Sequence, residues 1–178
     1  GVVSVMNRAA TEDTRSPAWP VVSELLSGSD APSELAGAVV ELLDTWVADD
    51  APQLDADNNG FNDHAGPTII SALWEPLARE VMRPVFGDSV DTLDSIRRLS
   101  GNSGSSFIHK DLRTLLGKDV DGPFNLQYCG AGDLTTCRDS LWAVVEDVSA
   151  DLAVQFGSDD PSTWLSEGRL LGFTPGLI

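Results

Sequence analysis

Lysine is nearly missing from this 178-residue sequence, in which Lys110 and Lys118 are the only copies. Arginine brings the basic residues to just 11 against 28 acidic ones, so the formal net charge is -17. A surface this acidic repels phosphate backbones and anionic lipids, and we therefore expect neither nucleic acid nor a membrane as a partner. The surplus of carboxylates suits oxygen-preferring cations, although solvation alone also explains it.

Long apolar runs are missing too. The longest, TIISALW over residues 68–74, falls far short of the roughly 18 apolar residues of a membrane-spanning helix. The sequence begins at Gly1 without a charged and then apolar leader, so we expect that any signal peptide has been removed or precedes this piece. With 42% hydrophobic residues, we expect one domain over 1–178, in which residues 1–29 are poorly assigned.

Cysteine is equally scarce, and both copies lie in the segment YCGAGDLTTC, as Cys129 and Cys137. The glycines between them let the backbone fold back, so we expect a local disulfide that stabilises the fold by roughly 2.5 kcal/mol. Such a bond persists in secreted or periplasmic proteins, and we expect that location. Two free thiols are the alternative, whereas a zinc site lacks histidines at ligand spacing.

Apolar residues recur at helical spacing along most of the chain, which predicts a mainly α fold with few or no strands. Only VVSV near the start and LLGF near the end have strand-like composition. Asp30 or Ser33 is the expected N-cap of the first helix, and Gly117 and Gly157 are expected helix stops. The expected helices span 33–47, 67–84 with a kink at Pro76, 91–99, 105–117 and 133–157, with one more turn at 160–164.

The segment LDADNNGFNDHAGP, residues 54–67, has the spacing of a calcium-binding loop. Gly60 takes the turn position of that loop, but Gly66 stands where a bidentate Glu is expected, so a site here needs water or another segment. A solvated polar turn explains the same composition without an ion. The expected ligands of a structural Ca²⁺ are Asp55, Asp57, Asn59, Phe61 through its carbonyl, and Asp63.

No catalytic group stands out in the sequence. His64 beside Asp63 is more typical of a polar loop than of an acid/base pair, and His109 is more typical of a helix boundary than of a base. The five tryptophans favour a buried core, with a cleft for a sugar or an aromatic ligand as the alternative. We therefore predict no catalytic and no organic cofactor-binding residues.

Four segments, ELLDTWVADD, LDADNNGFNDHAGPTIISALWEPL, YCGAGDLTTCRDSLW and GRLLGFTPGLI, together resemble part of the β chain of the penicillin acylase family, in its actinobacterial branch. The resemblance covers residues 30–178. Members of this family are N-terminal nucleophile hydrolases with an αββα sandwich, in which the β-chain N-terminal serine attacks an amide.

This sequence departs from that pattern at Gly1, which stands where the family has its nucleophile, so no catalytic residue carries over. The resemblance implies a helical part of a secreted hydrolase of linear acyl amides, inactive alone, whose partners are the remaining acylase segments and a small acyl-amide substrate. Two alternatives remain open. One is an independent secreted calcium-dependent binding module, and the other is a structural α domain without a metal.

Overall fold

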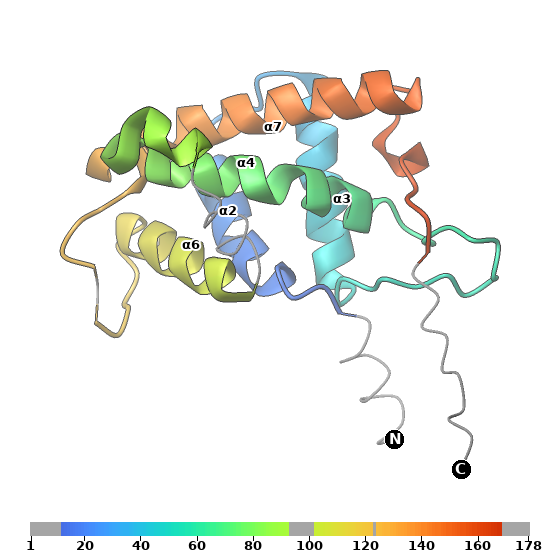
Figure 1. Ribbon diagram of the computed structural model, residues 1–178, viewed down its shortest axis with the longest axis horizontal. Coiled ribbons are helices and arrows are strands. Elements are labelled where there is room, and N and C mark those ends of the chain that lie inside the picture. Colours follow the sequence, from blue (N-terminus) through green and yellow to red (C-terminus); the bar gives the residue numbers. More distant parts are fainter. Residues whose placement is uncertain (1–11, 93–101, 123, 169–178) are drawn as a thin grey trace, which may run out of the picture.

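The computed structural model describes residues 12–92, 102–122 and 124–168, which form helices and no sheet (Figure 1). The expected mainly α fold is confirmed for these residues. None of their helices is both long and apolar enough to cross a membrane. The α-helices are α2 (Trp19–Leu26), α3 (Glu34–Ala48), α4 (Gly66–Phe86), α6 (Asn102–Leu115) and α7 (Leu134–Phe156), and the short 3-10 helices are η1 (Ser16–Ala18), η2 (Gly87–Asp91), η3 (Cys129–Gly132) and η4 (Pro161–Thr163).

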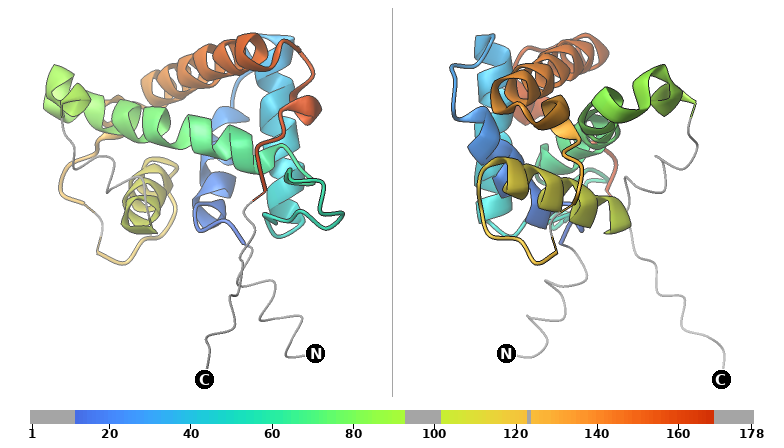
Figure 2. Two further views of the ribbon diagram at one scale, coloured as in Figure 1. Left: turned by 45° about the vertical axis from the view of Figure 1, so that its right-hand side comes forward. Right: turned by 90° about the vertical axis from the view of Figure 1, so that its left-hand side faces the viewer.

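The two longest helices, α4 and α7, pack against each other, and α3 crosses both (Figures 1 and 2). All five tryptophans lie buried in or beside the core between the helices, with at most 7% of each exposed. Buried indole N–H groups usually pair with an acceptor, and four of the five do so here, whereas the N–H of Trp74 has no acceptor among the described residues. Trp142, for example, donates to the carbonyl of Leu26 at 3.1 Å, and Trp46 donates to that of Pro52 at 3.0 Å. The tryptophans are therefore core residues.

Two helices begin and end where the sequence predicts. The Ser33 side chain accepts from the N–H of Ala36 at 3.2 Å and starts α3, and Asp133 accepts from Thr136 at 2.7 Å and starts α7. Gly157 ends α7 with a φ of 65°, a conformation that costs glycine little. The expected turn at 160–164 is also present, as η4, capped by Asp160.

The predicted end of α4 at Pro84 is wrong, because the helix continues to Phe86 and stops at Gly87, whose φ is 55°. It also runs without interruption through Pro76. Pro84 lies in the last turn, so its ring removes a single N–H close to a terminus that leaves carbonyls unpaired in any case.

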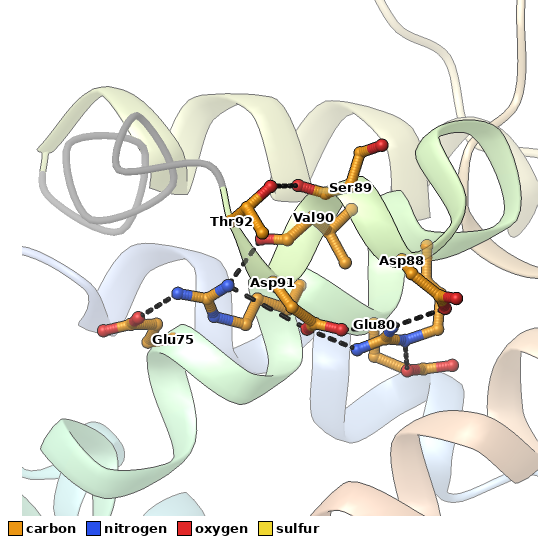
Figure 3. A network of polar contacts seen from close by, with 9 residues as sticks. Glu75, Glu80, Asp88, Ser89, Val90, Asp91 and Thr92 are labelled. Carbon is orange, nitrogen blue, oxygen red and sulfur yellow. Dashed lines mark hydrogen bonds and ion pairs between the residues drawn. The ribbon is translucent and has the colours of Figure 1, made fainter.

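The chain folds back onto α4 directly after Gly87, and two arginines hold it there (Figure 3). Arg79 bonds to Glu75 at 2.6 Å and to the carbonyl of Val90 at 2.5 Å. Arg83 bonds to Glu80 at 3.0 Å and to Asp91 at 3.0 Å. These pairs are partly exposed, and exposed ion pairs contribute at most about 1 kcal/mol each. Their main effect is to fix the direction of the chain.

Two other helices differ from the prediction. α6 begins at Asn102 rather than at 105, because the cost of a glycine, about 1 kcal/mol, is small once the apolar stripe of Ile108 and Leu112 is buried. α2 was not predicted at all. Its C-terminal carbonyls are bound from α7, where the Nε of Arg138 donates to Leu25 at 2.7 Å. The expected strands VVSV and LLGF, and residues 93–99 of the expected helix 91–99, lie outside the described residues.

Candidate metal centre

The Asp loop, residues 55–66, connects α3 to α4 at one edge of the molecule (Figure 1). Its turn has the left-handed backbone that calcium loops require. Gly60 has a φ of 94°, and Asn58, a residue type that tolerates this region, has a φ of 57°. The chain therefore reverses at the position predicted from the glycine.

The three aspartates of the loop converge. One carboxylate oxygen from each of Asp55, Asp57 and Asp63 lies within 4.8 Å of the other two. Two ligands of one Ca²⁺, each about 2.4 Å from the ion, are at most about 4.8 Å apart, so these oxygens are close enough to share a cation. The described arginines and lysines form their ion pairs elsewhere. The carboxylates therefore face one another without a neutralising side chain from the described residues.

Backbone N–H groups hold the carboxylates in this inward orientation. The N–H of Asn59 donates to Asp55 at 3.0 Å and to Asp57 at 3.1 Å, and the N–H of Gly60 donates to the second oxygen of Asp55 at 3.0 Å. Asp63 accepts from the N–H of Ala56 at 3.0 Å. This network pre-arranges three of the five predicted ligands, and it also stabilises the turn without an ion.

Of the other two predicted ligands, Asn59 turns its side-chain oxygen toward the N–H of Phe61, at 2.8 Å, and its amide nitrogen toward Asp57, at 3.0 Å. Phe61 is 46% exposed, and its backbone pairs with Glu167. Neither residue belongs to the carboxylate cluster itself. Their contribution as calcium ligands stays a prediction.

The structure explains why the loop lacks its final carboxylate. Gly66 begins α4 against the indole of Trp46, and a Cβ added to Gly66 would lie 2.2 Å from that ring. A glutamate side chain does not fit in this space. His64 sits beside it and accepts the N–H of Gly66 on Nδ1 at 2.9 Å, and burial lowers the pKa of His64, which keeps this nitrogen free to accept. His64 thus caps the start of α4.

A second segment, residues 166–168, lies directly against the Asp loop and was not predicted from the sequence. Gly168 donates its N–H to the carbonyl of Gly60 at 2.8 Å, and Asn62 donates its own to that of Ser166 at 2.9 Å. A Cβ at Gly168 would lie 2.8 Å from the Cβ of Asp55. More than 100 residues separate the partners, so no local pattern signals this pairing.

The expected disulfide between Cys129 and Cys137 is present, with an S–S distance of 2.03 Å. Its loop rests on Asp111 of α6, which is fully buried and accepts the N–H groups of Tyr128 and Cys129, each at 3.0 Å. Burial raises the pKa of Asp111, although both N–H donors act to lower it. His109, on the same helix, is half-buried, as expected for a boundary histidine.

Chemically, the Asp loop offers hard anionic oxygens, which are the ligands that Ca²⁺ and Mg²⁺ prefer. The disulfide and Asp111 are contributed by η3 and α6, so they form a separate structural cluster. Comparison with protein-family models and with curated proteins finds no match for this sequence.

Proposed function

We propose that this chain is a calcium-binding helical scaffold of a secreted penicillin-acylase-like amide hydrolase, which supports the acyl-binding cleft and lacks the nucleophile. The observation that carries the calcium part is the convergence of Asp55, Asp57 and Asp63 within 4.8 Å. A divalent cation removes the mutual repulsion of three carboxylates and satisfies their oxygens. Ca²⁺ suits the site better than Mg²⁺ because it accepts irregular shells in which water replaces a missing side chain.

The acylase part of the proposal rests on the resembling segments and on where they lie. Residues 41–50 fall at the end of α3, residues 54–77 cover the Asp loop and most of α4, and residues 128–142 cover η3 and the start of α7. These helices pack on one another, so the three segments form one connected body, whereas the fourth resembling segment lies outside the described residues apart from Gly168. The disulfide is compatible with an extracellular location.

A thermal melt with calcium and with a chelator tests the metal. A ligand present at 100 times its dissociation constant adds about 2.7 kcal/mol to the unfolding free energy. For a chain of this length that corresponds to a rise in Tm of roughly 5–10 °C. Equal melting temperatures in calcium and in chelator would contradict the metal site and leave a polar turn.

Matched variants locate the effect. Asp57→Asn and Asp63→Asn each remove a charge from the cluster, and we expect the calcium-dependent rise in Tm to disappear in both. Asp151→Asn removes the same charge from the exposed face of α7, and the rise should persist. Because the readout is the difference between calcium and chelator, a general loss of stability in a variant does not affect the conclusion.

The scaffold role is tested separately, by activity. The purified chain should hydrolyse no chromogenic acyl anilide, with or without calcium, because the resemblance supplies no nucleophile. Turnover by this chain alone would refute the scaffold role. If the encoding reading frame holds only a signal peptide and this domain, the alternative of an independent calcium-dependent binding module would be favoured.

A further inference from the structure

The peptide bond between Asn59 and Gly60 lies within the Asp loop, and this is the only Asn-Gly pair in the sequence. Both residues are exposed. In such a pair the backbone nitrogen that follows the asparagine can reach its side-chain carbonyl, because glycine has no side chain to obstruct the approach. The space around Gly60 is open as well, since a Cβ built there would have no atom within 4 Å apart from its chain neighbours. Ring closure at this bond is therefore sterically unhindered at Gly60.

The N–H of Gly60 points at a base. It donates to the second carboxylate oxygen of Asp55 at 3.0 Å. A backbone nitrogen is a poor nucleophile while it keeps its proton, because its lone pair is shared with the carbonyl. A carboxylate within hydrogen-bond distance can take that proton as the nitrogen attacks. Asp55 therefore meets the distance requirement for a general base at this nitrogen.

The side chain of Asn59 is held at both of its polar atoms. Its Oδ1 accepts the N–H of Phe61 at 2.8 Å, and its Nδ2 donates to Asp57 at 3.0 Å. The N–H only donates and the carboxylate accepts, which fixes the orientation of the amide. The ring closed by the first bond contains the Gly60 nitrogen, so the side chain is folded toward the group that would attack it. The Phe61 N–H also lies where it stabilises negative charge on Oδ1, as the donors of an oxyanion hole do.

We propose that Asn59 is a site of self-catalysed deamidation through a cyclic imide. The Gly60 nitrogen attacks Cγ of Asn59 and forms a bond to it, while the proton of that nitrogen passes to Asp55. The negative charge that forms on Oδ1 then returns to the carbonyl, the Cγ–Nδ2 bond breaks, and Nδ2 takes up the proton and leaves as ammonia. Water opens the imide at either carbonyl and leaves aspartate or isoaspartate at position 59. No atom is oxidised or reduced.

The two products change the Asp loop in different ways. Aspartate adds a fourth carboxylate to the three that converge here, whereas isoaspartate lengthens the backbone of the turn by a methylene carbon. The proposal depends neither on the acylase role nor on calcium. The experiment is carried out in chelator, so that no metal ion covers the carboxylates.

The test follows the folded full chain at neutral pH, below its melting temperature, by mass spectrometry of digested peptides. Hydroxylamine, which cleaves cyclic imides, should cut the chain after Asn59. We expect Asn59 to deamidate at least about tenfold faster than Asn125, which is also exposed but precedes the bulky Leu126. It should also deamidate faster in the folded chain than in a synthetic peptide of residues 54–67, where nothing holds Asp55 against the attacking nitrogen.

Two variants test the base. Asp55→Asn removes the proton acceptor with little change in size, and the deamidation of Asn59 should slow by at least about tenfold. Asp151→Asn removes the same charge from the exposed face of α7 and should leave the rate unchanged.

Three results would overturn the proposal. The first is that hydroxylamine does not cut after Asn59, and the second is that the folded chain reacts no faster than the peptide. The third is that Asp55→Asn reacts as fast as the unchanged chain, or is slowed no more than Asp151→Asn. The comparison with the peptide uses the unchanged chain, so it remains decisive if Asp55→Asn loosens the loop.

Discussion

The Trp46 side chain determines which residue can stand at Gly66, the last position of the Asp loop. The missing Cβ of Gly66 makes room for the indole of Trp46, and this contact joins the start of α4 to α3. The position is therefore required to be small by core packing, whatever the loop before it binds. The calcium-loop motif lacks its final glutamate at Gly66 because the Trp46 ring occupies the space of that side chain, while the turn of the loop is kept.

We expect Gly66→Ala to lower the unfolding free energy by about 1–3 kcal/mol, because the added carbon must displace the buried Trp46. Urea unfolding followed by tryptophan fluorescence measures it. Ala143→Val adds carbon at an exposed site on α7 and should cost no more than about 0.7 kcal/mol. Equal losses in the two variants would mean that the Trp46 contact is not tight.

The buried carboxylate of Asp111 supports the disulfide loop through two hydrogen bonds. Each of its oxygens accepts one backbone N–H, so Asp111→Asn places an amide NH₂ against one of these donors. The unfolding free energy should fall by about 1–3 kcal/mol in denaturant titrations. Asp121→Asn, exposed in the following turn, should have almost no effect. An unchanged stability in Asp111→Asn would show that the two bonds contribute little.

The pKa of Asp111 gives a pH dependence with a definite sign. Burial raises the folded-state pKa above the ordinary 3.8, so the folded protein retains this proton to higher pH than the unfolded chain does. The resulting stability is complete below pH 3.8 and is lost as the pH rises through the folded pKa. The unfolding free energy of the unchanged chain, relative to Asp111→Asn, should therefore fall as the pH rises from 3.8. A flat or rising difference would contradict this.

At the scale of elements, the helix ends that depend on neighbouring residues in the sequence were predicted correctly. Caps at Ser33 and Asp133 and the stop at Gly157 are read directly from residue type, and α3 and α7 follow from them. α2 was missed because tertiary contacts determine it, through α7 side chains that bind its last carbonyls. The Asp loop, like the caps, was predicted because its residue types and spacing are local in sequence. Its contacts with Ser166 and Gly168 were not predicted, because these residues lie far along the chain.

The disulfide-closed element η3 is tested by removing its bond. Cys129→Ala with Cys137→Ala should lower the unfolding free energy by about 2.5 kcal/mol, from the loop entropy of eight residues. Because the chain has only two cysteines, reducing the unchanged protein should give a similar loss in the same urea titration. A loss near zero in both would show that Asp111 alone orders this loop.

At the scale of the whole molecule, residues 51–62 form backbone hydrogen bonds with residues near both ends of the described chain. The N–H of Asp13 donates to Ala51 at 3.1 Å, and that of Gly168 donates to Gly60 at 2.8 Å. If calcium orders the Asp loop, chelation should speed hydrogen exchange at the amides of Asn62 and Gly168 and leave α7 amides such as Val145 unchanged. Mass spectrometry of exchanged peptides measures this, and uniform exchange changes across the molecule would contradict a local role.

These two attachments also determine how the molecule responds to force. Glu12 pairs with Pro52 and Glu167 pairs with Phe61, each through an isolated bridge and not through a helix. A pull between the two glutamates loads a few hydrogen bonds near Ala51 and Gly60 before it reaches the core of α3, α4 and α7. The force at which extension begins is therefore determined by this loop, and calcium concentration would tune it while the buried core stays the same.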